Sequence, residues 1–337
     1  MSSSHRAIMI REPGVVAAPV KVPTPDPGPG QVRVRVEACG VCFADQGVLS
    51  GGQNGSFPAT PGHEIAGRVD AVGGGVDGWS VGDRAALGWF GGSCGICDAC
   101  RVGDVVQCPQ RRTPGPSYPG GWAETVTAPA AALARIPDGL DPVDAAPMGC
   151  AGVTTFNAVR SSTAGPGDVV AVIGLGGLGH LAVQFATAMG FTVVAVARSA
   201  DKATDARELG AAHFVASSEA DVGAALRDLG GASLVYSTAA DTTVAQQAVA
   251  GLRSRGELLV SGIGPDRLSL DVGALVLRGL RVRGHVTGGP IDIQDTMRFA
   301  VAAGVRPWIE VGGLDDAAGA IAALRAARLR YRAVLTP

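Results

Sequence analysis

Residues 169–190 read VVAVIGLGGLGHLAVQFATAMG, and this stretch decides the fold of the second half of the chain. Five apolar residues of the β type run into the glycine-rich turn GLGGLG at 174–179, and apolar positions then recur at helical spacing. The order strand, tight turn, helix is typical of a dinucleotide-binding unit, whereas a merely glycine-rich turn would not need both flanks. In such a turn Gly174 permits the bend, Gly176 lets the backbone approach a pyrophosphate and Gly179 lets the helix pack on the strand. The candidate cofactor-binding glycines are Gly174, Gly176, Gly177 and Gly179.

Five more apolar, strand-like runs follow, separated by alanine-rich stretches of helical character. With Val169–Ile173 they make six strands with intervening helices, which predicts a doubly wound parallel sheet. A tail after about residue 288 contains an apolar, helix-like segment over residues 315–327 and a final strand at Arg332–Leu335. The five runs are Val193–Val196, His213–Val215, Leu234–Tyr236, Leu258–Val260 and Val282–Gly284.

The end of the second strand favours NADP(H) over NAD(H). An NAD site places Asp or Glu there to accept a hydrogen bond from the ribose 2′-hydroxyl, but this strand ends in Val-Ala-Arg-Ser at residues 196–199. Arg198, Ser199 and the nearby Lys202 could hold a 2′-phosphate by charge-assisted hydrogen bonds. The alternative is that these three residues form a solvated loop.

The first 150 residues have a different texture. They are dense in Gly and Pro and contain short alternating runs such as QVRVRVE at residues 31–37. This pattern predicts an all-β region with many turns and little helix.

Composition excludes several classes of protein. With 337 residues, 47% hydrophobic and 17% charged, the chain has enough apolar material for two ordinary domains. The net charge of -2 and the scattered basic residues predict no nucleic-acid or anionic-membrane partner. The apolar stretch 169–197 is broken by glycines and carries His180 and Gln184, so it predicts buried strands and a helix rather than a membrane span. The N-terminal sequence MSSSHRAIMIREPG has no long apolar segment typical of secretion, and a cytoplasmic location is expected.

All seven cysteines precede residue 151, and four of them lie close together. The C-x2-C-x2-C spacing followed by a fourth cysteine lets one loop wrap a tetrahedral ion, and a closed set of four thiolates indicates a structural zinc. The alternatives are free or paired cysteines, and a nucleic-acid zinc ribbon, for which a basic flank is missing. The four candidate ligands are Cys94, Cys97, Cys100 and Cys108.

Three further segments carry metal-binding residue types: GVC at 40–42, GHE at 62–64 and MGC at 148–150. Each alone is ordinary, because a single buried Cys or His is more often core than ligand. In order with the four-cysteine lobe, CAGVTT at 150–155 and GLGGLG, they make the chain resemble the zinc-dependent alcohol dehydrogenases of the medium-chain dehydrogenase/reductase family over essentially its whole length.

The resemblance implies an α/β fold in two domains. A GroES-like, β-rich catalytic domain would comprise residues 1–152 and 289–337, and a Rossmann domain with a doubly wound parallel sheet would be inserted at residues 153–288. The tail is therefore expected to return to the N-terminal β region.

The resemblance also implies a catalytic zinc, the second zinc of the chain, held by Cys42, His63 and Cys150. Two thiolates and a neutral imidazole leave an open position where the ion can polarise a carbonyl or stabilise an alkoxide. Glu64 would lie next to the metal and Asp45 would orient His63.

Further roles follow from the same resemblance. Arg332 matches a family arginine that contacts the cofactor pyrophosphate, and Thr154 matches a residue beside the nicotinamide. Cys39 lies outside the motif and is interpreted as a packed thiol. Pro290 stands where many relatives carry an arginine, which leaves more of the phosphate contact to Arg332.

The proton relay of the family is missing here. Its usual pattern places a basic residue and then Ser or Thr after the zinc-binding cysteine, but this chain has Phe43 and Ala44, and Gly47 stands where a relay histidine can occur. General acid–base assistance is worth about 10²- to 10⁴-fold, so the loss should matter for alcohol–carbonyl exchange. His285 is a candidate substitute acid, with a structural role as the alternative.

Three functions stay open on this basis. The first is a zinc-dependent carbonyl reductase that takes its proton from elsewhere, working in the reductive direction because cells generally keep NADP reduced. The second is a reductase of an iminium or conjugated C=C bond, and the third is a noncatalytic protein that binds zinc and nucleotide.

The substrate and the assembly are less defined. Five aromatic residues fall near segments that line the substrate cleft in the family, which indicates either a bulky or aromatic small-molecule substrate or simple core packing. Relatives of this length are commonly homodimers or homotetramers. The aromatic residues are Phe43, Trp89, Phe90, Tyr118 and Trp122.

Overall fold

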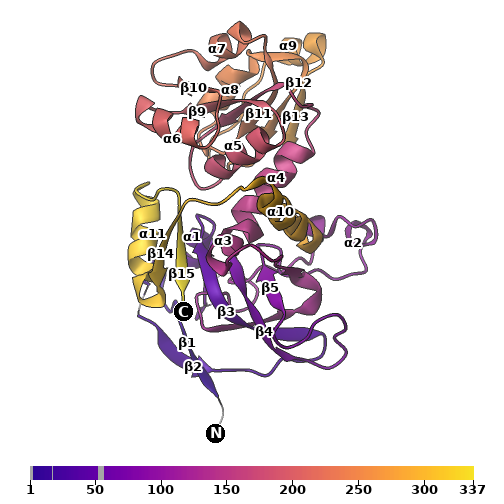
Figure 1. The fold of residues 1–337 in the computed structure, drawn as a ribbon, viewed down its shortest axis with the longest axis vertical. Helices are drawn as coiled ribbons and strands as arrows, with labels where there is room; N and C mark the ends of the chain where they lie inside the picture. Colours follow the sequence, from indigo (N-terminus) through magenta and orange to yellow (C-terminus); the bar gives the residue numbers. More distant parts are fainter. Residues whose placement is uncertain (1–2, 17, 52–56) are drawn as a thin grey trace. The chain divides into compact units, whose positions relative to one another are not determined.

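The computed structural model describes residues 3–16, 18–51 and 57–337, and its contacts divide the chain into two compact units. The first unit comprises Met1–Val153 and Thr287–Pro337, and the second comprises Thr154–Val286 (Figure 1). Among the described residues, no helix combines the length and the apolar character needed to cross a bilayer.

The second unit contains a parallel sheet of six strands in the order β10-β9-β8-β11-β12-β13. This order begins in the middle and winds outward in both directions, which is the Rossmann arrangement, and it confirms the predicted doubly wound sheet. The strands are β8 (Val169–Ile173), β9 (Thr192–Ala197), β10 (His213–Ala216), β11 (Ala232–Ser237), β12 (Leu252–Val260) and β13 (Arg281–Gly284).

Burial explains why these runs form central strands. Every residue of β11 is buried, and Val170–Ile173 of β8 are at most 2% exposed, as expected for strands covered on both faces. The crossover helices lie on the two faces of the sheet (Figure 1). They are α5 (Gly179–Ala188), α6 (Ala203–Glu208), α7 (Val222–Asp228), α8 (Thr243–Val249) and α9 (Val272–Arg278), and α4 (Val153–Arg160) precedes the first strand.

The first unit contains a sheet in the order β14-β15-β3-β4-β5-β7, with β6 also paired to β3, and a two-stranded sheet of β1 and β2. Its strands are β1 (Ser4–Ala7), β2 (Val20–Pro23), β3 (Gln31–Val41), β4 (Ile65–Val72), β5 (Arg84–Leu87), β6 (Thr125–Pro129), β7 (Leu133–Arg135), β14 (Ile309–Gly313) and β15 (Arg332–Thr336). In β3, buried and more exposed side chains alternate as the sequence predicts: Val32, Val34 and Val36 are buried while the arginines between them are not. Before residue 153, the described helices are α1 (Asp45–Leu49), α2 (Asp98–Arg101), α3 (Pro142–Pro147), two short 3-10 turns at Val105–Gln107 and Ala130–Ala132, and a π-helical turn over Met148–Gly152.

The tail returns to this sheet. β15 pairs antiparallel with β3, with Ala333 opposite Val41 and Leu335 opposite Cys39, and α11 (Ala317–Arg325) occupies most of the predicted helical segment. Two elements of the tail were not predicted: α10 (Pro290–Ala303), and β14, which runs parallel to β15.

Candidate metal and cofactor sites

A buried cluster forms where three distant segments meet in the first unit. Ligand atoms of Cys42, His63, Glu64 and Cys150 all lie within 4.8 Å of one another. Cys42 follows the end of β3, and His63 and Glu64 precede the start of β4. Because β3 and β4 pair antiparallel with Cys39 opposite Ile65, these two segments meet at the same end of the strand pair. Cys150 comes from the π-helical turn.

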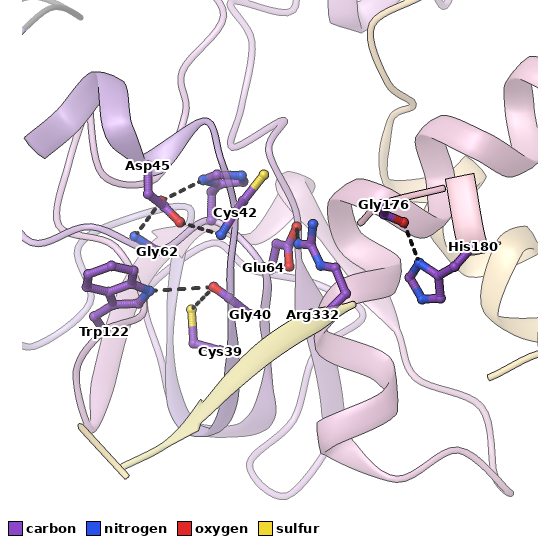
Figure 2. Close-up of polar contacts among 11 residues, drawn as sticks. Cys39, Gly40, Cys42, Asp45, Gly62, Glu64, Trp122, Gly176, His180 and Arg332 are labelled. Atoms are coloured by element: carbon purple, nitrogen blue, oxygen red, sulfur yellow. Dashed lines mark hydrogen bonds and ion pairs between the residues drawn. The ribbon is translucent and has the colours of Figure 1, made fainter. Parts of the chain in front are cut away.

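Asp45 fixes the geometry of this cluster (Figure 2). Its carboxylate accepts hydrogen bonds from the backbone N–H of Cys42 at 2.9 Å, the backbone N–H of Gly62 at 3.2 Å and Nδ1 of His63 at 3.0 Å. A carboxylate only accepts, so Nδ1 carries the hydrogen and Nε2 is left as the ligand atom. Nε2 is buried and has no hydrogen-bond partner among the described residues, so the imidazole fits a metal ion at the cluster.

The charges at the cluster also suit a cation. A hydrogen bond from the Cys150 thiol lowers the pKa of Cys42 well below its usual value, while the same bond and burial raise the pKa of Cys150. Burial alone would lower the pKa of His63, but the charges of Asp45 and Cys42 raise it well above its usual value. Two cysteine sulfurs and one imidazole nitrogen match the donors that zinc takes at catalytic sites.

Glu64 and Arg332 form a buried ion pair beside these donors. Arg332 Nη2 donates to Glu64 Oε1, and the two side chains are 3% and 0% exposed (Figure 2). Burial raises the pKa of Glu64 to about 7 against the opposing charge of Arg332. Gly40 makes room for the pair, because a Cβ there would lie 2.0 Å from Glu64 Oε2. Arg332 Nε has no hydrogen-bond partner among the described residues, and the predicted contact with a pyrophosphate stays a prediction.

The four-cysteine lobe forms a second, more exposed cluster. Ligand atoms of Cys94, Cys97, Cys100 and Cys108 lie within 4.8 Å of one another, with Cys94 Sγ 3.6 Å from Cys108 Sγ and Cys97 Sγ 3.5 Å from Cys100 Sγ. Backbone N–H groups of Cys94 and Cys97 point at sulfurs of the lobe at 3.4 Å. A hydrogen bond from the backbone of Ile96 lowers the pKa of Cys94 to about 6, which favours the thiolate that binds metal.

The glycine turn of the second unit has the geometry of a phosphate cradle. Gly174 has φ +92°, and a Cβ on Gly179 would lie 1.7 Å from the Gly174 carbonyl oxygen, so neither position accepts another residue without strain. A Cβ on Gly176 would meet nothing within 4 Å, which leaves the backbone open to a ligand. Sequence reasoning missed His180, which is buried and donates from Nδ1 to the Gly176 carbonyl at 3.0 Å (Figure 2). Its only signal was a polar side chain in an apolar helix.

The predicted phosphate-binding residues lie beyond the end of β9. Arg198 and Ser199 are exposed and Lys202 is half-buried. Two carboxylates unnoticed in the sequence lie beside them. Asp201 accepts a hydrogen bond from Ser199 Oγ. The backbone N–H of Thr243 lowers the pKa of Asp241, and the charge of Arg198 acts in the same direction.

The other predicted residues separate into core and surface. Trp122 and Phe90 are 0% and 3% exposed, so core packing accounts for them, whereas Phe43 next to Cys42 is 65% exposed. Thr154 is buried and its hydroxyl donates to the Val286 carbonyl at 3.1 Å. The carbonyl of His285 accepts from the Ser261 hydroxyl at 2.7 Å.

Comparison with known proteins agrees with this geometry. The family model described as "Alcohol dehydrogenase GroES-like domain" matches residues 28–138, and that described as "Zinc-binding dehydrogenase" matches residues 177–302. The chain is 40% identical over 334 residues to an alcohol dehydrogenase, patD, of Penicillium expansum, covering 99% of this chain and 98% of the relative.

Solved structures of alcohol dehydrogenases are also similar to this chain over nearly its whole length. A cinnamyl alcohol dehydrogenase of Sorghum bicolor is similar with TM-score 0.90 and 30% identity, over 99% of this chain and 98% of that one. A CAD of Helicobacter pylori complexed with NADP(H) is similar with TM-score 0.89 and 25% identity, over 100% of this chain and 99% of that one.

Proposed function

Because this chain belongs to the zinc-dependent alcohol dehydrogenases of the medium-chain dehydrogenase/reductase family, we propose that it is an NADPH-dependent reductase of a carbonyl substrate. The family makes it a zinc-binding oxidoreductase that uses a nicotinamide nucleotide and a small-molecule substrate. The observation that carries the proposal is the buried Cys42–His63–Cys150 cluster, in which Asp45 turns the unpartnered His63 Nε2 toward the two sulfurs.

Each residue of the cluster has a distinct task in this proposal. Cys42, His63 and Cys150 hold the metal, Asp45 fixes the ring and tautomer of His63, and Arg332 balances the charge of Glu64 next to them. When bound, zinc supplies a Lewis acid for the carbonyl oxygen and the nicotinamide supplies the hydride. The four-cysteine lobe would hold a second, structural ion, which makes two zinc ions per chain.

Arg198, Ser199 and Lys202 support the preference for NADP(H). They lie where the second strand ends, and no carboxylate stands at the strand end itself. Each charge-assisted hydrogen bond is worth about 1.5–3 kcal/mol, so removing Arg198 and Lys202 together should lower kcat/KM for NADPH by more than tenfold and leave NADH within twofold. Arg207→Ala, an exposed arginine on α6, is the matched control for loss of charge.

A second reaction is favoured by one observation, the absence of a hydroxyl at Ala44 beside an exposed Phe43. A hydride acceptor that needs no proton on an oxygen, such as an iminium carbon or a conjugated C=C bond, would not require the missing relay. The two reactions share the metal and cofactor sites and differ in product.

Domains, assembly and location complete the proposal. The catalytic domain comprises residues 1–152 and 289–337 and the nucleotide domain residues 153–288. Helix α9 exposes Val272, Val276 and Leu277 at 69–88%, next in sequence to the edge strand β13, which supports a homo-oligomer formed through this unit. Two clusters of reduced cysteines suit a reducing compartment, the cytoplasm.

The test is NADPH consumption against a matched panel of aldehydes, ketones, iminium ions and conjugated enals, with NADH in parallel. Each product is identified by mass and NMR, and His63→Ala is the inactive control. Turnover of aldehydes and ketones supports the carbonyl reductase, and reduction at C=N or C=C supports the second reaction. No turnover of any class by a zinc-loaded protein would overturn both.

A further inference from the structure

One exposed arginine stacks on an aromatic ring and has no acidic partner among the described residues. The Arg111 guanidinium carbon lies 5.2 Å from the centre of the Trp89 ring, a cation–π stack, and the residue is exposed. Its side chain makes no ion pair or hydrogen bond with any residue that the structure describes. The stack covers one face of the guanidinium, and its edge N–H donors are left for a ligand.

Trp89 is tied to the segment that carries Cys150. Its backbone N–H donates to the Gly149 carbonyl at 3.3 Å, and a Cβ on Gly88 would lie 2.0 Å from that same oxygen. Gly149 directly precedes Cys150. The ring under Arg111 therefore belongs to a residue in backbone contact with the metal-binding turn.

The backbone also fixes Arg111 itself. Its N–H donates to the Cys108 carbonyl at 3.0 Å, so it leaves directly from the four-cysteine lobe. The next residue, Arg112, exchanges backbone hydrogen bonds with Gly91 at 2.7 Å and Gly92 at 2.8 Å. These bonds hold the arginine segment beside the tryptophan segment, and the stack on Trp89 positions the guanidinium itself.

The second cysteine of the cluster also has an aromatic neighbour. Phe43 follows Cys42 and is 65% exposed, a large apolar surface for a side chain next to a buried donor. Aromatic rings thus lie next to both cysteine-bearing segments, and of these two rings it is Trp89 that an arginine covers.

We propose that Arg111 is a specificity residue that binds an anionic substituent, such as a carboxylate, on an aromatic carbonyl substrate. The inference rests on the proposed function and names its substrate class. The flat ring of the substrate packs near Phe43 and Trp89 while the anion accepts from the edge of the guanidinium, at the end of the substrate away from the reacting carbon.

The experiment compares kcat/KM with NADPH for 4-carboxybenzaldehyde and for benzaldehyde. Arg111→Gln should lower the ratio of the two values about tenfold by loss of a charge-assisted pair, through KM rather than kcat, and leave benzaldehyde within twofold. Arg111→Lys should recover part of the ratio because it keeps the charge without the paired donors.

Arg112→Gln is the matched control. Arg112 is the adjacent exposed arginine and stacks at 4.8 Å on a different ring, that of Tyr118, so the variant makes the same charge change and likewise removes a cation–π stack. Its ratio should stay within twofold of wild type. An unchanged ratio in Arg111→Gln, or an equal fall in Arg112→Gln, would overturn the assignment.

A binding measurement separates this inference from the proposed function. Calorimetric titration compares 4-(hydroxymethyl)benzoate with benzyl alcohol in wild type and in Arg111→Gln. If no aldehyde or ketone of the panel is reduced, the proposed carbonyl reduction fails, yet selective binding of the benzoate that depends on Arg111 still supports the anion site. Equal binding of both alcohols by wild type contradicts the anion site.

Discussion

The cysteines of the lobe lie between residues 94 and 108, whereas the buried cluster draws its members from residues 42 to 150. The lobe is one loop whose sulfurs receive backbone N–H groups from its own residues. In the buried cluster, by contrast, one carboxylate, Asp45, ties the segment of Cys42 to that of His63. On the proposed assignment metal orders the lobe, while the rest of the fold orders the buried cluster. Loss of metal is therefore expected to unfold the lobe but only to abolish activity at the buried cluster.

The largest expected effect is a loss of activity without unfolding when the buried cluster loses its metal. His63→Ala removes the ring whose Nε2 has no hydrogen-bond partner among the described residues, and loss of several kcal/mol of carbonyl polarisation lowers kcat/KM by about 10³-fold or more. Metal analysis should give one zinc per chain with an unchanged far-ultraviolet circular dichroism spectrum. Two zinc ions retained together with activity would show that His63 is not a ligand.

The matching change in the lobe is Cys97→Ala. It should also leave one zinc, but lower the unfolding free energy by about 3 kcal/mol, in the upper range for single substitutions, with a smaller loss of activity. Urea unfolding beside metal analysis checks this. A lobe variant as stable as wild type would erase the contrast between the clusters.

A smaller effect is expected at Asp45, which contacts His63 rather than the metal itself. Asp45→Asn keeps the shape but weakens the acceptor for His63 Nδ1, so zinc affinity at the buried cluster should fall about 10- to 100-fold. Competition with a chelator measures it, and the lobe zinc of the same sample serves as the internal control. Equal weakening at both sites would contradict the assignment.

Restoring a hydroxyl should produce a gain at the buried cluster. If the missing relay limits alcohol oxidation, Ala44→Thr raises kcat for simple alcohols by about tenfold, well within the range of acid–base assistance. Ala44→Val introduces a side chain of nearly the same volume as Thr but without the hydroxyl, and it should not raise kcat for simple alcohols. A gain in both variants would point to packing rather than proton transfer.

The smallest effect concerns a cysteine outside both clusters. Burial raises the pKa of Cys39 well above its usual value, so the thiol stays protonated in the fold. The unfolded thiol ionises near pH 8.5, and the stability that this thiol contributes is therefore full below that pH and lost as pH rises above it. Cys39→Ala should cost about 1 kcal/mol, keep both zinc ions and flatten the fall in stability above pH 8.5. A lost zinc in this variant would make Cys39 a ligand.

The sequence predicted the features that depend on neighbouring residues and not those that depend on distant segments. Local patterns were enough for the six parallel strands and for the four-cysteine spacing, because each depends on residues close together in the chain. The buried cluster could not be derived that way, since Cys42 and Cys150 are brought together by β3, β4 and the π-helical turn; only a family resemblance suggested it.

Three features of the structure were not predicted from the sequence, each for a physical reason. Helix α10 buries Ile293, Met297 and Ala300 at helical spacing, so its signal was present but was not read in the tail. β14 contains two glycines and pairs, among the described strands, with β15 alone, which left no strand pattern to recognise. The Arg332–Glu64 contact joins residues 268 positions apart, and no local pattern encodes it.

The return of β15 to β3 has a consequence for synthesis on the ribosome. Residues 154–286 can fold as soon as they have left the exit tunnel, because their sheet is complete by β13. The sheet that supports the buried cluster, although begun first, lacks β14 and β15 until residue 336 is translated, and with them the guanidinium that faces Glu64. The part of the enzyme started first is therefore finished last, and a premature stop after the nucleotide unit would release a folded cofactor domain attached to an incomplete metal site.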